Sequence, residues 1–145
     1  MIASLVLMIT CQELETIHSE HDQLSEAALA NGIERGWLPP FLLASPLPYV
    51  LAYDLDTNRR CARFAYSEAD LAKLESRAIA AGFTVTREAI PAPKRISRFK
   101  SCPVGPADLV EVRLLTRLPR SDSIYHEALA ISPRSGQAFY WEYQR

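Results

Sequence analysis

The sequence predicts an α+β fold: a mainly antiparallel sheet of about five to six strands, with one main helix and a short N-terminal helix packed on it. Three observations predict this class. Two pairs of apolar-rich segments are each joined by a short turn, as in β-hairpins. A further segment has the periodicity of an amphipathic helix. The 145 residues, 48% hydrophobic and 23% charged, have the composition of one ordinary globular domain.

The first eleven residues, MIASLVLMITC, have two interpretations. A short apolar run suits a buried strand or a first helical turn. It also suits the apolar part of a secretory signal, and bacterial lipoproteins are cut and lipidated at a cysteine directly after such a run. No Lys or Arg precedes the run, so a signal here requires a start codon assigned too late. Residues 1–11 are therefore a candidate truncated signal with Cys11 as the lipidation site, and residues 12–145 are a single domain.

Residues 22–32, DQLSEAALANG, predict the short N-terminal helix. Asp22 or Ser25 can accept from its first N–H groups, and Gly32 can form the left-handed turn at its end. The segment 36–48, GWLPPFLLASPLP, contains four prolines, which exclude a regular helix or a central strand. We expect it to cover the core in an extended form, pinned by four buried side chains: Trp37, Leu38, Phe41 and Leu42.

Residues 49–55 and 60–66 predict the first hairpin. The main helix is expected over residues 67–82, with Ser67 as its N-cap, Asp70 at the third helical position and Gly82 at its end. Its apolar face repeats at helical spacing and consists of Leu71, Leu74, Ala78 and Ala81.

The last part of the chain predicts the remaining strands. Residues 83–89 alternate as a strand, residues 91–108 form a Pro-rich loop, and residues 109–118 alternate again. The terminal hairpin is expected around PRSG, with Pro133 at the first corner of the turn and Gly136 in its left-handed position.

The first hairpin turn, DLDTN, begins like a calcium-binding loop. Such a loop requires Gly at its sixth position and Glu at its twelfth, where this chain has Arg59 and Ala65. We therefore predict a turn without a metal, stabilised by bonds from side chains to nearby backbone N–H groups. The residues concerned are Asp54, Asp56, Thr57 and Asn58.

Two other patterns are candidate binding sites. His18 and His21 have the HxxH spacing, which on a helix places two rings on one face, but His126 is the only other histidine and a solvated polar stretch is favoured. Residues 94–100, KRISRFK, could contact phosphates and stack a base. A net charge of −1 favours a solvated loop instead, so neither metal nor nucleic acid is predicted.

No catalytic motif is present: there is no GxSxG elbow, Gly-rich phosphate loop or HExxH. Glu127 follows His126 on a predicted strand, where neighbours point to opposite faces and cannot act as a pair. We predict that the chain is not an enzyme and needs no cofactor.

The three cysteines leave Cys61 and Cys102 as a pair if Cys11 carries lipid. A bridge would close a loop of about forty residues and stabilise the fold by roughly 4 kcal/mol in the chain-entropy model. The favoured alternative is two thiols, with Cys61 packed in its strand as a small hydrophobe.

Two segments, EAALANGIERGWLP and YDLDTNRRCARFAY, carry a resemblance. They are similar to a family of small bacterial proteins of unknown function, many described as lipoproteins. Its pattern of Gly-Trp-Ile/Leu-Pro is matched by residues 36–39, including Gly36, Trp37 and Pro39. Its Asp-Leu-Asp-Thr-Asn turn and following Phe-x-Phe/Tyr strand are matched by residues 54–58 and by Phe64 and Tyr66. The resemblance covers residues 26–75 well, supports lipidation of Cys11 and implies no activity.

Together these features predict a non-catalytic bacterial envelope protein with a binding or structural role. A lipid on Cys11 would hold it on the periplasmic face of a membrane; without a truncated start, the chain is expected in the cytoplasm. Its expected partner is another protein. The alternative is a soluble inhibitor or immunity-type protein that neutralises a protein partner by surface contact.

Overall fold

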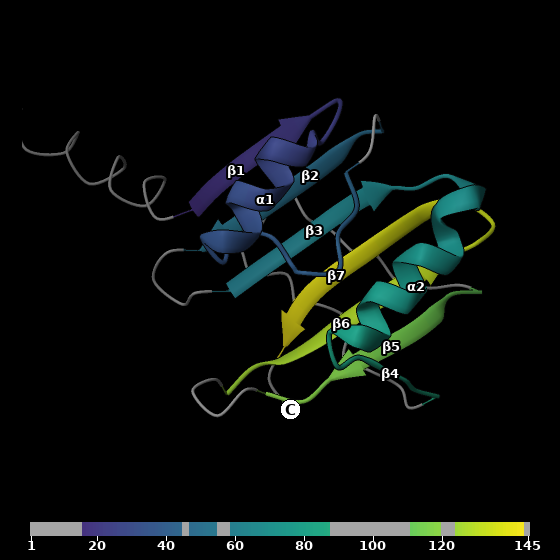
Figure 1. Ribbon diagram of the computed structural model, residues 1–145. Helices are drawn as coiled ribbons and strands as arrows, with labels where there is room; N and C mark the ends of the chain where they lie inside the picture. Colours follow the sequence, from purple (N-terminus) through teal and green to yellow (C-terminus); the bar gives the residue numbers. More distant parts are fainter. Residues whose placement is uncertain (1–15, 45–46, 55–58, 88–110, 120–123, 144–145) are drawn as a thin grey trace, which may run out of the picture.

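The computed structural model describes residues 16–44, 47–54, 59–87, 111–119 and 124–143, and for residues 16–21, 54 and 59 the backbone alone. Within these residues, seven antiparallel strands form one sheet in the order β1-β2-β3-β7-β6-β5-β4 (Figure 1). The same described residues contain two α-helices and one short 3-10 helix, which confirms the predicted α+β class. The strands are β1 (Thr16–His21), β2 (Tyr49–Asp54), β3 (Arg59–Ala65), β4 (Thr84–Val85), β5 (Arg113–Arg117), β6 (His126–Ser132) and β7 (Gln137–Tyr143).

Both predicted hairpins are confirmed, and they meet at the centre of the sheet. β2 pairs with β3, and β6 pairs with β7. β3 then pairs with β7, from Cys61 opposite Trp141 to Ala65 opposite Gln137. Gly136 has a φ of +63°, the left-handed conformation expected in the terminal turn. The N-terminal and C-terminal strands are thus joined through β3 and β7.

β1 is a strand that the sequence did not predict. It pairs antiparallel with β2 along its whole length, from Thr16 opposite Asp54 to His21 opposite Tyr49. Its sequence, TIHSEH, is polar, and polar residues are common on an edge strand. His18 and His21 thus lie on a strand, whereas the metal interpretation of their HxxH spacing assumed a helix.

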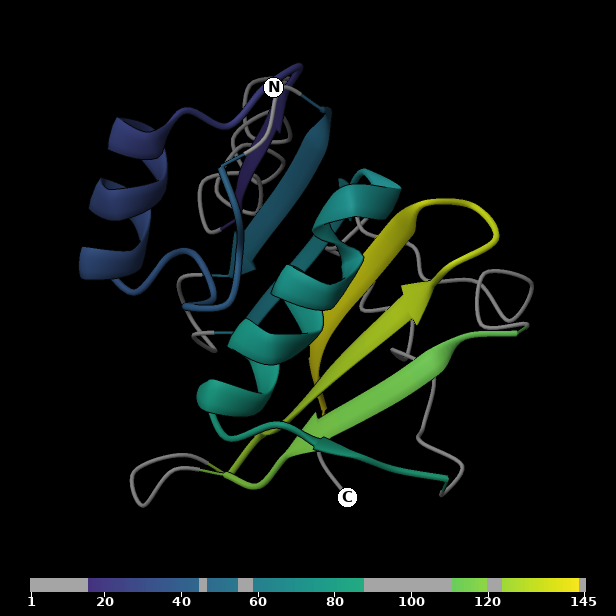
Figure 2. The same ribbon diagram turned by 45° about the vertical axis from the view of Figure 1, so that its right-hand side comes forward.

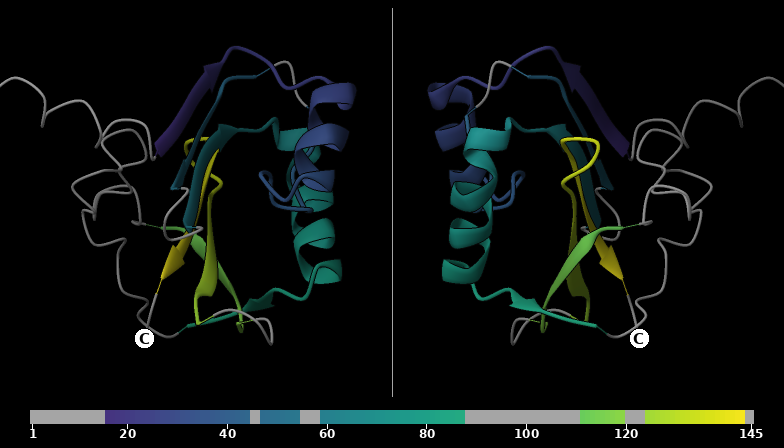
Figure 3. Two further views of the ribbon diagram at one scale, coloured as in Figure 1. Left: turned by 90° about the vertical axis from the view of Figure 1, so that its left-hand side faces the viewer. Right: turned by 90° about the vertical axis from the view of Figure 1, so that its right-hand side faces the viewer.

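Both helices cover the same face of the sheet (Figures 2 and 3). α1 (Glu26–Glu34) lies beside β1 and β2, and α2 (Leu71–Ala80) lies over the half formed by β7, β6 and β5. The main core fills the space between. At its centre Phe41 contacts Phe83 and Tyr140 edge-on, with ring centroids 5.2 and 5.6 Å apart. Phe64, from the resemblance pattern, is buried in the same core.

The opposite face of the sheet also carries buried side chains. They form a second cluster of Ala52, Cys61, Ala128, Ala130, Phe139, Trp141 and Tyr143. Cys61 therefore packs as a small buried side chain, as expected. Cys11 and Cys102 lie outside the described residues, so lipidation and the Cys61–Cys102 pairing stay predictions, as do the interpretations of residues 94–100.

α1 begins and ends later than predicted. Ser25 is the N-cap, and its Oγ accepts from the Ala28 N–H at 3.2 Å. Gly32 lies inside the helix instead of ending it. A Cβ there would meet the Leu38 side chain, with Cγ at 2.7 Å, so the close approach of Leu38 requires glycine at this position. Gly36 supplies the left-handed turn with a φ of +72°.

α2 starts differently from the predicted capping box. Ser67 makes no side-chain cap to a backbone N–H. Its Oγ instead donates to the Asp70 carboxylate at 2.6 Å, and the first turn, Glu68–Asp70, is a 3-10 helix. The predicted apolar face and the terminal Gly82, with a φ of +92°, are confirmed.

Two predicted strands are shorter than expected. The one over residues 83–89 is reduced to β4, while residues 88–89 lie outside the described part. Of the one over residues 109–118, residues 109–110 lie outside the described part, and β5 begins at Arg113, after Glu111 adopts a φ of +57°. Glu111 is not part of the strand, since extended strands have negative φ.

Trp37 is not buried, contrary to the prediction. It is 39% exposed, whereas Leu38, Phe41 and Leu42 are at most 5% exposed. Gly36 turns the chain so that Leu38, not Trp37, enters the core beside Gly32. Of the DLDTN turn, only the Asp54 backbone in β2 is described, so its side-chain bonds stay a prediction.

Candidate functional site

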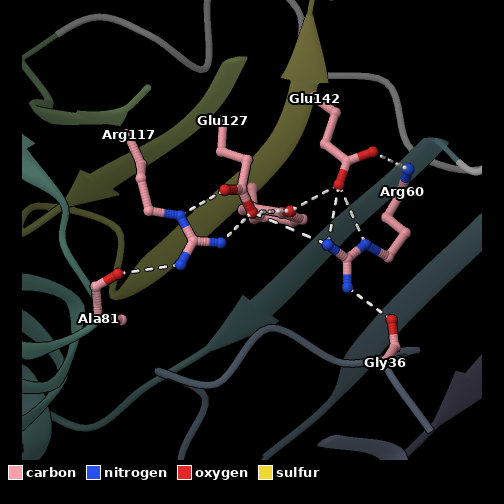
Figure 4. Close-up of polar contacts among 7 residues, drawn as sticks. Gly36, Arg60, Ala81, Arg117, Glu127 and Glu142 are labelled. Carbon is pink, nitrogen blue, oxygen red and sulfur yellow. Dashed lines mark hydrogen bonds and ion pairs between the residues drawn. The ribbon is translucent and has the colours of Figure 1, made fainter. Parts of the chain in front are cut away.

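A buried group of charged and polar side chains lies on the helix-covered side of the sheet, and Figure 4 shows the contacts among its members. Its members come from four strands: Arg60 from β3, Arg117 from β5, Glu127 from β6, and Tyr140 and Glu142 from β7. We call these five residues the polar network. On an otherwise apolar strand face, a buried charge is retained only where partners satisfy it.

The sheet register brings the two carboxylates together. Glu127 and Glu142 are directly opposite each other on β6 and β7, and they are 5% and 8% exposed. Two like charges in this position repel each other. The repulsion is offset because Arg117 binds Glu127 and Arg60 binds Glu142, and Arg60 Nη2 also lies 3.8 Å from Glu127 Oε1. The four charged groups sum to zero.

In both of these ion pairs two guanidinium nitrogens bind the carboxylate, but those of Arg60 share one oxygen and those of Arg117 bind one oxygen each. The Arg60 Nε and Nη2 donate to Glu142 Oε1 at 3.1 and 2.9 Å, and its backbone N–H donates to Oε2 at 3.0 Å. The Arg117 Nη2 donates to Glu127 Oε1 at 2.6 Å, and its Nε donates to the second oxygen. Such forked bonds are stronger and more directional than single ones.

Tyr140 links the two pairs. Its hydroxyl lies 2.7 Å from Glu127 Oε1 and 3.1 Å from Glu142 Oε1, so one proton is shared between two acceptors. Burial, reinforced by Glu142, raises the pKa of Tyr140 well above its usual range. For Arg60, burial acts to lower the pKa, but Tyr140 and Glu142 outweigh it and the pKa is raised. The tyrosine therefore keeps its proton and the arginine its charge.

The network also reaches the ends of both helices. Arg60 Nη1 donates to the Gly36 carbonyl at 2.5 Å, just after α1. Arg117 Nη1 donates to the Ala81 carbonyl at 2.9 Å, at the end of α2. Cations stabilise helix C-termini because the last carbonyls are unpaired and carry partial negative charge. Each arginine thus joins a sheet carboxylate to a helix end.

This arrangement is suited to anchoring rather than to acid–base chemistry. Both carboxylates are bound by a guanidinium and by the tyrosine, and both guanidinium groups also bind a carbonyl. The charged side chains are only 7–15% exposed, and a general base must reach its substrate directly or through one water. Within the described part of the chain, no group of His, Cys, Asp or Glu is placed to hold a metal.

One end of the network holds an exposed aromatic residue. The Trp37 N–H donates to the Gly32 carbonyl at 2.9 Å, and Arg60 binds the carbonyl just before it. The Arg35 guanidinium lies over the Trp37 indole, 5.0 Å from its centroid. Arg35 is itself held by its Nε, which donates to Asn31 Oδ1 at 3.0 Å. Trp37 is therefore solvent-accessible but fixed in place.

Sequence reasoning singled out Gly36, Trp37 and Pro39 but not the network. His126 and Glu127 do lie on opposite faces, and the His126 ring stacks on Tyr143, with centroids 5.3 Å apart. Arg60, Arg117, Tyr140 and Glu142 were missed because their contacts depend on strand register. The available signal was Glu127 and Glu142, each a lone acid within an apolar strand.

In a comparison with protein families, residues 15–65 match the model of the YbbD head domain. The match covers less than half of the chain and spans β1, α1, the Gly36–Trp37 turn, β2 and β3. It includes Arg60 but none of the network residues on β5, β6 and β7. No curated protein and no solved structure matches the chain.

In the described residues, no helix is long and apolar enough to cross a membrane.

Proposed function

We propose that this chain is a non-catalytic binding domain of the bacterial envelope, and that it contacts a protein partner through the turn around Trp37. The binding role is supported by one observation: the Trp37 side chain is exposed while its backbone is held by hydrogen bonds. A side chain 39% exposed whose backbone is held on both sides loses little freedom on binding. Tryptophan and arginine are also the residues most enriched at binding hot spots.

The absence of catalysis is proposed from the polar network. Its titratable groups bind one another and two helix ends, which leaves them a structural role. The envelope location rests on the sequence alone, through the apolar run before Cys11 and the family resemblance. The second candidate, a soluble inhibitor or immunity-type protein, draws on the same observation, because the Trp37–Arg35 pair suits a protein surface in either compartment.

The binding role is tested by comparing two exposed apolar residues. A photo-crosslinking residue at the exposed position 34 on α1 would identify the partner in cells. The purified partner would then be titrated against Trp37→Ala and against Ile79→Ala, whose side chain on α2 is 56% exposed. We expect Trp37→Ala to weaken binding by roughly thirtyfold or more, the loss of a hot spot of about 2 kcal/mol. Equal affinities for the two variants would contradict the proposal.

Stability provides the matching control. Because Trp37 is partly exposed, its truncation is expected to lower the free energy of unfolding by only about 1–2 kcal/mol, less than truncation of a buried aromatic. Urea unfolding of the variant checks this value and separates lost binding from lost folding.

The location is tested separately. The gene, with the DNA upstream of Met1, is expressed in cells fed a palmitate analogue. Envelope anchoring predicts label on the wild-type chain and none on Cys11→Ser. An unlabelled wild-type chain in the cytoplasmic fraction would instead favour the inhibitor.

A further inference from the structure

We infer that Arg60 is the positioning residue for the Trp37 turn, so that the buried polar network fixes the direction in which the exposed indole points. This deepens the proposed function, since it concerns the same surface. The inference rests first on which peptide bond Arg60 contacts. The Gly36 carbonyl belongs to the peptide bond that enters Trp37, and Arg60 Nη1 holds it at 2.5 Å.

Gly36 needs such a restraint more than an ordinary residue does. It has a φ of +72°, and a Cβ built on it would have nothing within 4 Å, so its surroundings do not confine it sterically. Glycine also has the widest range of backbone conformations. The peptide between Gly36 and Trp37 is held by hydrogen bonds rather than by packing: its N–H donates to the Gly32 carbonyl at 2.9 Å, and its carbonyl accepts from Arg60. Arg60 therefore supplies the bond that ties this peptide to the sheet.

Arg60 is itself immobile because of its partners on the sheet. Its guanidinium is held by Glu142 at 2.9 and 3.1 Å and lies 6.0 Å from the Tyr140 ring centroid. The planar guanidinium can bind Glu142 through two nitrogens and still direct the third to Gly36, as Figure 4 shows. A lysine ammonium has no such rigid fork and cannot reproduce all three bonds.

Arg117 supplies a matched control within the same network. It binds Glu127 through two guanidinium nitrogens, and it donates to a helix-end carbonyl, but that carbonyl is Ala81 of α2. Loss of Arg117 thus disturbs the network at the other helix and leaves the bonds of Arg60 to Glu142 and Gly36 in place. If Arg60 positions Trp37, only the Arg60 side of the network affects the indole.

Tryptophan fluorescence can measure this directly. The chain has two tryptophans, and Trp141 is 1% exposed, so collisional quenching by acrylamide reports on Trp37. The two charge-balanced variants to compare are Arg60→Gln with Glu142→Gln, and Arg117→Gln with Glu127→Gln. Balancing the charges avoids an unpaired buried ion, which would be strongly destabilising. A Trp37→Phe variant confirms which signal is quenched.

We expect the Arg60 double variant to raise the Trp37 quenching constant by roughly twofold, because an indole 39% exposed can become more accessible, and to lower its anisotropy. The Arg117 double variant should leave both unchanged. An unchanged Trp37 signal in the Arg60 variant, or equal changes in the two variants, would overturn the inference. This readout needs no partner, so it can fail while the binding role stands, or hold while binding fails.

If the Arg60 double variant does not fold, Arg60→Lys replaces it, because lysine keeps the charge but not the fork. The amide heteronuclear relaxation of Trp37 is then compared with that of Leu38, whose side chain stays anchored in the core. Increased motion at Trp37 alone supports the inference, and unchanged Trp37 relaxation overturns it.

Discussion

Two glycines at the end of α1 are required for different reasons. Gly32 lies inside the helix, where a Cβ would meet the buried Leu38 side chain. Gly36 has open space around it but a left-handed backbone. Sequence reasoning treated Gly32 as a helix end because glycine usually serves there. Only the three-dimensional approach of Leu38 shows that Gly32 answers a steric requirement.

Substitutions at these glycines should therefore behave differently. Gly32→Ala gains about 1 kcal/mol of helix propensity but overpacks a buried site, which costs about 1–3 kcal/mol. Gly36→Ala costs about 1–2 kcal/mol through its backbone, and Gly36→Asn costs less because asparagine tolerates this conformation. Urea unfolding should show that asparagine is better than alanine at position 36 but worse than alanine at position 32. If the asparagine and alanine variants had the same order of stability at both positions, the different roles of Gly32 and Gly36 would be refuted.

The Tyr140 hydroxyl links stability to alkaline pH. In the unfolded chain a tyrosine loses its proton near pH 10, whereas burial holds the pKa of Tyr140 well above that in the fold. The folded state then binds more protons than the unfolded state, so stability present below pH 10 is lost as pH rises above it. We expect the wild type to lose up to about 1.4 kcal/mol per pH unit more than Tyr140→Phe in that range. If the free energy of unfolding fell equally with pH in the wild type and in Tyr140→Phe, the folded state would not retain the Tyr140 proton as proposed.

At the scale of elements, local chemistry predicted most of the fold. Both hairpins and the apolar face of α2 follow from periodicity and turn residues that act over a few positions. β1 could not be predicted in this way, because TIHSEH lacks apolar alternation and is a strand through pairing with β2. The polar network was hidden for the same reason: strand register, rather than sequence proximity, brings Arg60 to Glu142.

At the β4 edge of the sheet, two residues that are paired between strands differ widely in burial. Val85 on β4 is opposite Leu115 on β5, yet Val85 is 61% exposed and Leu115 only 1%. Leu115→Ala should lower the free energy of unfolding by about 2–5 kcal/mol, because it leaves a cavity in the core. Val85→Ala should change it by about 0.5 kcal/mol or less. Thermal unfolding of both variants checks the contrast, and comparable losses would mean that the edge strand is packed more tightly than its exposure indicates.

At the scale of the whole molecule, the segment that matches the YbbD head domain is not packed as a separate unit. Its last strand, β3, uses its second edge to pair with β7. Phe41 from this segment contacts Phe83 and Tyr140 from the rest of the chain. Arg60 likewise depends on Glu142 for its position. The core and the polar network are therefore both completed by residues beyond the matched segment.

Division of the chain between Tyr66 and Ser67 tests this dependence. We expect residues 1–66 and residues 67–145, produced separately, to lack cooperative unfolding, because each would expose one edge and one apolar face of the central β3–β7 pair. Mixing the fragments should restore a cooperative urea transition and move the Trp141 emission to shorter wavelength as the indole becomes buried. Cooperative unfolding of fragment 1–66 alone would show that its two strand pairs and α1 are sufficient for folding. In that case the residues after Ser67 would add to a preformed unit rather than complete one.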